Sequence, residues 1–263
     1  MNLARGLMLR VPRAMLLALV LLAASLAGCF GDDSLTAEPY GVPGGLALAC
    51  LRADEFTKLV IEIDYEADHK PRPETTDMLV QRLSSVCDKT SVTFELWLTD
   101  FEQDATWTDD EIRSIGRTSR ASDAMNGDEL RFHLMFPAGS HTREGVLGSA
   151  VDASTAMIFI DDVKAAENML QRPSWEKMEA AVTVHEVGHL LGLVNLVYTS
   201  TIDHEDSSNS GHSSNDESVM YWAVESTDLA NVIFGTVPND FDDDDRADLA
   251  ALASGELEAE DQL

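Results

Sequence analysis

Alternation of hydrophobic and polar residues in the chain predicts four β-strands. Residues 58–65 (KLVIEIDY) and 92–98 (VTFELWL) alternate apolar with polar positions and are rich in β-branched or aromatic side chains. Residues 130–136 (LRFHLMF) and 156–160 (AMIFI) give a third and a fourth strand. A period of two residues places alternate side chains on opposite faces of a sheet, so these segments predict a sheet with at least one buried face.

Helical spacing appears between and after these strands. The apolar residues of segment 76–86 recur every three or four positions, and residues 174–191 form a longer amphipathic helix. Thr108 and Glu111 have the spacing of a capping box, which predicts a helix start. Segment 240–252 begins acidic and turns apolar, as a helix with carboxylates at its positive N-terminal dipole would.

Two segments lack periodicity and are expected to be loops. Residues 139–148 carry several glycines, and residues 195–218 are rich in Ser, Asp, Asn and His. The resulting order β-α-β-α-β-β-α-loop-α predicts an α/β or α+β domain with a mixed sheet.

The N-terminal segment has the layout of a secretory signal. Arg5, Arg10 and Arg13 precede an apolar run at 14–26, and small residues then lead to Cys29. The run is shorter than the roughly 20 residues that span a bilayer. The segment resembles a bacterial or archaeal lipoprotein signal, in which the cysteine is lipidated and becomes the mature N-terminus. An uncleaved anchor helix is the alternative, and both place the remaining chain outside the cytoplasm.

The chain is therefore expected to have four parts. Residues 1–28 are a signal peptide, and residues 29–54 are a lipidated N-terminus and tether. Residues 55–255 form the folded domain, and residues 256–263 are an acidic tail.

The remaining cysteines form an even pair once Cys29 is assigned to lipid. In an exported protein a disulfide between Cys50 and Cys87 is an open alternative to two free thiols.

The charge balance excludes one class of partner. The chain has 18 basic and 47 acidic residues, a formal net charge of −29. This field repels nucleic acid and anionic lipid surfaces, so we expect no nucleic-acid partner and membrane contact through the lipid anchor only. We expect a monomer with a solvated acidic surface.

The long helix contains the motif His185-Glu186-Val187-Gly188-His189. Residues four apart project from the same face of a helix, so His185 and His189 can share one zinc ion at about 2.0–2.1 Å. Glu186 follows the first histidine, where its carboxylate can take a proton from a water molecule at the metal. The alternative is two core histidines that are hydrogen-bonded to backbone.

Residues 185–192 (HEVGHLLG) resemble the HExxHxxG opening of the metzincin metallopeptidases. In that family the glycine turns the chain out of the helix toward a third ligand, and a methionine lies in a tight turn beneath the metal. Residues 218–221 (SVMY), with Met220, look like that turn. The resemblance implies a twisted mixed sheet of about four or five strands, an active-site helix, a loop-rich lower part and a C-terminal helix. It also implies one catalytic zinc ion.

The third ligand departs from the usual metzincin pattern. The usual histidine position is Asn195, and an amide is a poor zinc ligand. Two loop histidines are candidates. His212 resembles the third histidine of the archaemetzincin branch, because its spacing to Met220 matches with serine at both cysteine positions. The resemblance then implies an insertion of most of residues 193–211, and no second metal is carried over. His212 is favoured, and His204 stays open as the alternative.

Other residues suggest further roles at or near the site, with weaker support. Glu217 or Glu225 would be the third ligand in a different zinc-peptidase class, which Gly192 and Met220 argue against. Residues 145–161 resemble the edge strand along which metzincins pair their substrate. Tyr221 is interpreted as a packed aromatic rather than an oxyanion donor, and the acidic run Asp242–Asp245 as a helix start rather than a calcium site.

Together these features predict a zinc-dependent endopeptidase that is anchored outside the cell membrane and acts on peptide or protein substrates. The expected roles are zinc ligation by His185, His189 and His212 and proton transfer by Glu186. The alternatives are a surface lipoprotein that binds metal or adheres without catalysis, and an acidic surface protein whose HExxH motif is accidental.

Overall fold

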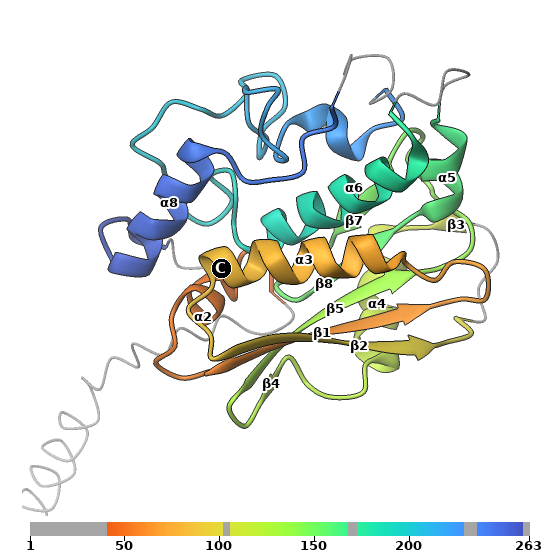
Figure 1. Cartoon of the computed structure of the whole chain (residues 1–263), viewed down its shortest axis with the longest axis horizontal. Coiled ribbons are helices and arrows are strands. Elements are labelled where there is room, and N and C mark those ends of the chain that lie inside the picture. The colour runs from red at the N-terminus through yellow and green to blue at the C-terminus, as the bar shows by residue number, and fades with distance from the viewer. Residues whose placement is uncertain (1–40, 102–105, 168–172, 229–235, 260–263) are drawn as a thin grey trace, which may run out of the picture. The chain divides into compact units, whose positions relative to one another are not determined.

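The computed structural model describes residues 41–101, 106–167, 173–228 and 236–259 (Figure 1). The predicted signal segment, Cys29 and the first part of the predicted tether, residues 29–40, lie outside these residues. Within them, no helix is both long enough and apolar enough to cross a bilayer.

The described residues form one six-stranded mixed sheet. Its main path runs β2 (Ser91–Leu98), β1 (Lys58–Tyr65), β5 (Glu129–Phe136), β8 (Thr155–Ile158) and β7 (Gly148–Ala150). The first four strands are parallel, β7 is antiparallel to β8, and the short β4 (Met125–Asn126) pairs with the start of β5. A separate pair joins β3 (Thr106–Trp107) and β6 (Ser140–His141). The predicted mixed sheet is confirmed.

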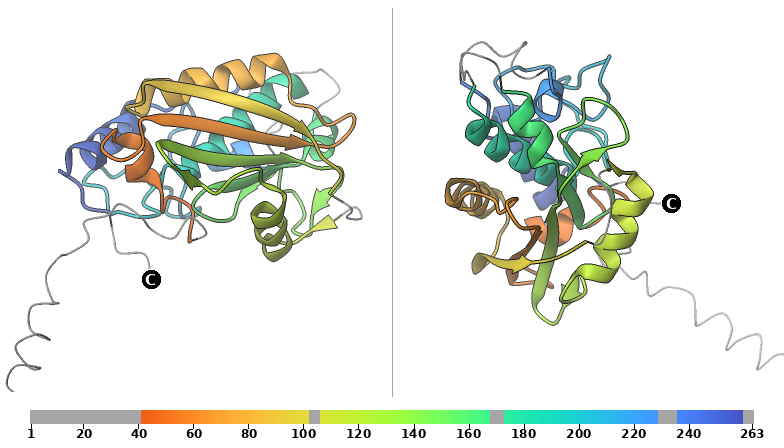
Figure 2. Two further views of the ribbon diagram at one scale, coloured as in Figure 1. Left: turned by 90° about the horizontal axis from the view of Figure 1, so that it is seen from below. Right: turned by 90° about the vertical axis from the view of Figure 1, so that its right-hand side faces the viewer.

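Side-chain alternation on β1 explains the layers on the two faces. Leu59, Ile61 and Ile63 belong to the main core, whereas Glu62 and Asp64 point to the opposite face. The main core lies under α3 (Pro73–Val86) and α6 (Trp175–Leu190). Figure 2 shows these two helices on one side of the sheet and α4 (Asp109–Ser119) on the other.

Helix starts follow the predicted chemistry in two places. Thr108 caps α4, and its side chain and that of Glu111 make both capping-box hydrogen bonds. The acidic run begins α8 (Asp243–Ser254), where Asp242 caps the helix and Asp245 completes the box. The acidic residues therefore act as a helix start.

Three short elements depart from the sequence expectations. The fourth strand ends at Ile158, and the chain turns at once into α5 (Ile160–Ala165). A 3₁₀ helix, η1 (Trp222–Glu225), follows the predicted methionine turn. The tether boundary at residue 54 is wrong, because α2 (Ala47–Leu51) lies inside the core with Leu46. This apolar turn is buried against α8 and the end of α3.

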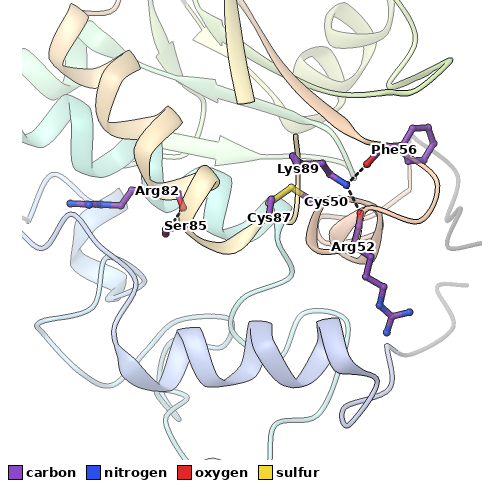
Figure 3. The surroundings of a disulfide bond; sticks show 7 residues. All are labelled: Cys50, Arg52, Phe56, Arg82, Ser85, Cys87 and Lys89. Carbon is purple, nitrogen blue, oxygen red and sulfur yellow. Dashed lines mark hydrogen bonds between the residues drawn. A yellow bond between two sulfur atoms is a disulfide. The ribbon is translucent and has the colours of Figure 1, made fainter. Parts of the chain in front are cut away.

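A disulfide fixes this N-terminal helix to the domain (Figure 3). Cys50 of α2 is bonded to Cys87 at the end of α3, with 5.3 Å between their Cα atoms. Next to it, the Lys89 ammonium group donates hydrogen bonds to the carbonyls of Arg52 and Phe56. The open question of the cysteine pair is thereby answered in favour of a disulfide.

Candidate metal centre

Helix α6 holds the HExxH motif in the middle of the protein rather than at its surface. Every residue from Met178 to Leu190 is buried. The helix was expected to be amphipathic, but the sheet, α3 and the loop-rich C-terminal part together cover all its sides. Its polar residues are therefore inside the protein, and each needs a partner there.

Three imidazole rings come together at the C-terminal half of α6. The ring centroids of His185, His189 and His212 lie 4.7 to 5.2 Å from one another. The Nε2 atoms of His185 and His189 are 3.1 Å apart. The structure thus brings together the three residues that sequence analysis grouped.

Backbone carbonyls determine which nitrogen of each ring is free. The Nδ1 atom of His185 lies 2.7 Å from the Val219 carbonyl, and that of His189 lies 3.1 Å from the Leu193 carbonyl. A carbonyl can only accept a hydrogen bond, so in each neutral ring Nδ1 carries the proton and Nε2 has a free lone pair. His212 has the same arrangement, with Nδ1 3.2 Å from the Ser210 carbonyl.

This arrangement fits a bound metal cation. Lone pairs of His185 and His189 that face each other at 3.1 Å repel unless a positive centre lies between them. Burial lowers the pKa of His189 to about 3, with smaller contributions from the other two imidazoles, so this ring is neutral at physiological pH. Neutral imidazoles with their second nitrogen on a backbone carbonyl are typical zinc ligands.

The glycine turn directs the chain toward the third imidazole. Gly192 has a φ of +83°, which a residue with a side chain rarely adopts. Gly44 packs directly on this turn, since a Cβ on Gly44 would lie 2.6 Å from the Gly192 Cα. The turn therefore depends on contact with the chain just before α2.

The predicted insertion is a closed excursion of the chain. Its two ends meet where the Val194 amide donates to the Gly211 carbonyl at 3.4 Å. Inside it, the Glu205 carboxylate accepts hydrogen bonds from the Asn195 side chain, the Ser210 hydroxyl and the Gly211 amide, at 2.8 to 2.9 Å. The added residues therefore leave and return at nearly the same place, and His212 reaches the other two rings.

Asn195 and His204 have roles away from the three rings. Asn195 has a φ of +58° and also accepts the Ser200 amide, so it shapes the loop. His204 is buried against α8, where its Nε2 lies 3.0 Å from Asp248 and its Nδ1 3.8 Å from Asp245. The structure thus places the alternative ligand in a different cluster.

Met220 lies beneath the motif as the predicted turn requires. A Cβ on Gly188 would lie 2.2 Å from the Met220 sulfur, so the helix and the methionine meet only because residue 188 is glycine. The neighbouring Tyr221 is half-buried and packs against the main core.

Glu186 is buried against the sheet edge. A Cβ on Gly148 of β7 would lie 2.5 Å from its Oε1 atom, so the glycine makes room for this carboxylate. Burial raises the pKa of Glu186 well above its usual range, and the Glu225 carboxylate adds to the rise. A nearby cation would counter both effects.

Glu225 is the residue that sequence analysis placed least well. It was considered as a replacement for the third histidine, but its carboxylate lies in one group with all three histidines. Its Oε1 lies 3.1 Å from His212 Nε2, and its Oε2 lies 3.7 Å from His185 Nε2. The other candidate, Glu217, is exposed and is not part of this group.

Two further groups of acidic and histidine side chains occur in the described part of the chain. Glu62, Asp64 and His133 lie on the sheet face beneath α4, where His133 bridges Asp64 and the Gly116 carbonyl. His204 forms the other group with Asp242 and Asp245.

The comparisons with known proteins find solved structures that are similar to this chain. No protein-family model matches the sequence, and no curated protein matches it. The chain is similar to the archaemetzincin from Methanopyrus kandleri, with 15% identity, a TM-score of 0.47, and coverage of 76% of this chain and 97% of that one. It is also similar to the malonate complex of the Archaeoglobus fulgidus archaemetzincin, with 15% identity, a TM-score of 0.41, and coverage of 72% and 98%.

Proposed function

We propose that this protein is a zinc-dependent endopeptidase. The observation that carries the proposal is the convergence of three imidazole rings, with the buried carboxylate of Glu186 next to the first of them in the motif. His185, His189 and His212 would hold the ion. When bound, zinc supplies a Lewis acid that polarises a carbonyl and lowers the pKa of a water molecule toward neutrality.

Glu186 is proposed as the general base. It follows His185 directly on α6, and its side chain is buried against the edge strand β7. It would remove a proton from the attacking water and deliver that proton to the leaving amine. Its burial supports this role, because the pKa of a carboxyl group that is shielded from solvent responds strongly to charges that develop nearby.

A peptide in extended form is the proposed substrate class. Strand β7 ends the main path of the sheet next to Glu186. An extended chain that adds to such an edge is held by main-chain hydrogen bonds, which do not depend on its sequence.

We also propose that the domain is held outside the cell membrane by lipid on Cys29. The support is the order of arginines, apolar run and small residues before this cysteine. Replacement of Cys29 by Ala should move the protein from the detergent phase to the aqueous phase in a detergent partition experiment. Equal partition of both forms would contradict the anchor.

The activity is tested by three substitutions. Glu186→Gln should keep one zinc ion per chain and abolish cleavage of a peptide library, because an amide cannot accept the proton. His212→Ala should lose zinc, whereas the matched His204→Ala should retain it, since His204 contacts Asp248 instead. Unchanged cleavage by the Glu186→Gln variant would contradict the mechanism.

The second candidate is a surface protein that binds zinc without catalysis. The contact of Glu225 with two of the imidazoles favours it, because structural zinc sites have four protein ligands. It predicts one zinc ion per chain and no cleavage by either the natural protein or the Glu225→Gln variant.

A further inference from the structure

We propose that Glu225 is a fourth protein ligand of the metal and that substrate must displace it. The inference rests on the proposed function in one respect, namely that the three histidines bind zinc. It assigns a role to η1, and it makes the observed structure the closed form of the site.

The distances around Glu225 match those between ligands of one tetrahedral ion. Two ligands at about 2.0–2.1 Å from zinc in tetrahedral geometry are roughly 3.3 Å from each other. The measured separations are 3.1 Å between the Nε2 atoms of His185 and His189, 3.1 Å between His212 Nε2 and Glu225 Oε1, and 3.7 Å between His185 Nε2 and Glu225 Oε2. One potential ligand atom from each of the four residues lies within 4.8 Å of the others. Glu225 therefore lies where a fourth ligand would.

The orientation of the His212 ring supports a metal contact. The Nδ1 atom of His212 lies 3.2 Å from the Ser210 carbonyl, which leaves Nε2 as the nitrogen that faces the Glu225 carboxylate. A lone pair and a carboxylate at 3.1 Å repel each other unless a cation or an additional proton lies between them. Zinc would supply that cation, between His212 Nε2 and the Glu225 carboxylate.

The backbone around Glu225 fixes the carboxylate in place. The Glu225 carbonyl accepts the Leu147 amide at 2.8 Å, and the Thr227 amide donates to the Gly145 carbonyl at 2.9 Å. Val146 and Ser226 form an antiparallel bridge between these bonds. The chain from Glu225 to Thr227 therefore pairs with the segment that leads into the edge strand β7.

This pairing blocks the site in two ways. The carboxylate takes the coordination position that a substrate carbonyl needs, and the backbone takes main-chain groups next to β7 that an extended peptide could use. Both contacts come from one short segment, so its displacement would free the ligand position and the edge together. The side chain of Glu225 is 30% exposed, so solvent and substrate can reach it from outside.

The test compares the natural protein with Glu225→Gln and with Glu217→Gln, a matched change at an exposed glutamate of the same region. Zinc affinity is measured by competition with a chelator, and geometry by the visible absorption of the cobalt-substituted protein. We expect Glu225→Gln to bind zinc at least about tenfold more weakly, since loss of a mere supporting hydrogen bond already costs about 10–100-fold. Its cobalt spectrum should also change, because a carboxylate ligand is replaced by water or an amide and the ligand field of the ion is altered.

The outcomes separate this inference from the proposed function. Equal zinc affinity and equal cobalt spectra for Glu225→Gln and the natural protein would overturn Glu225 as a ligand, and an additional proton would then explain its contact with His212. If His212→Ala retained zinc as well, the proposed metal centre itself would fail. A Glu225→Gln variant that binds zinc more weakly and cleaves peptides faster would support Glu225 as a ligand that substrate displaces.

Discussion

At the scale of single residues, the metal centre depends on glycines that make room for larger side chains. Gly148 of β7 leaves space for Glu186, and Gly188 within the motif leaves space for Met220. Neither role requires an unusual backbone angle, because neither glycine has a positive φ. Their value lies in the missing Cβ atom.

Gly148→Ala should therefore disable catalysis while zinc remains bound. The new Cβ would lie 2.5 Å from Glu186 Oε1 and 2.7 Å from its Cγ, so the base must move. Displacement of a catalytic group by about 1 Å can cost about 100-fold in rate. We expect a fall of roughly 10–100-fold in peptide cleavage with unchanged zinc stoichiometry. Full activity would show that Glu186 does not act from its observed position.

Asp245 predicts a pH dependence of stability. Burial raises its pKa to about 6, and the neighbouring Asp242 adds to the rise against the hydrogen bond from Ser218. The unfolded value is about 3.9, so the folded protein binds this proton more tightly. The stabilisation is complete below about pH 4 and is lost as the pH rises through 6. His204, whose pKa is raised, changes in the same direction, and Asp248, whose pKa is lowered, changes in the opposite direction.

Asp245→Asn isolates the effect of Asp245 from these neighbours. Relative to the natural protein, the free energy of unfolding of the variant should rise by about 2–3 kcal/mol between pH 4 and pH 7. Urea unfolding at several pH values measures this difference. Asp243→Asn, at an exposed residue of the same helix turn, is the control and should show no such trend. A constant difference for Asp245→Asn would contradict the raised pKa.

At the scale of elements, the inserted loop determines whether His212 reaches the imidazoles of His185 and His189. Glu205 accepts three hydrogen bonds that tie the loop ends together. Glu205→Ala should weaken zinc binding by about 10–100-fold, the usual effect of losing the groups that hold a ligand. Asp203→Ala, at an exposed residue of the same loop, should bind zinc like the natural protein. Equal affinities for the two variants would mean that the loop ends are held by other contacts.

The sequence predicted those elements whose pattern is long and local. Strand β1 has the predicted bounds, the capping box of α4 lies at the expected residues, and α8 has the expected acidic start. Helices α2 and α5 have five and six residues, too few to show a helical period. Such short buried segments are stabilised by tertiary contacts that the local sequence does not encode.

The same distinction applies to the metal centre. His185, Glu186 and His189 were found because a helix sets their relative positions over one turn. The position of Glu225 depends on its backbone pairing with Leu147, which comes from a distant part of the chain. No local pattern reports such a contact, so η1 and its carboxylate could be placed only in three dimensions.

At the scale of the whole molecule, the disulfide links the N-terminal helix to the metal centre. The bond between Cys50 and Cys87 holds α2 against the end of α3. The chain just before α2 carries Gly44, which packs on the Gly192 turn at the end of α6. A covalent bond at one end of α2 thus supports the turn that directs the chain toward His212.

Cys50→Ala/Cys87→Ala should lower both stability and zinc affinity. The bond closes a loop of 37 residues, and the chain-entropy relation gives about 4 kcal/mol for a loop of this length. For a domain of this size that corresponds to a fall in Tm of about 8–15 °C. The chain before α2 also packs against Gly192 through Gly44. We therefore expect zinc affinity to fall severalfold when it is measured at 20 °C, where the variant is still folded. A lower Tm with unchanged zinc affinity would show that the Gly44 contact does not need the disulfide, whereas an unchanged Tm would show that α2 is held by packing alone.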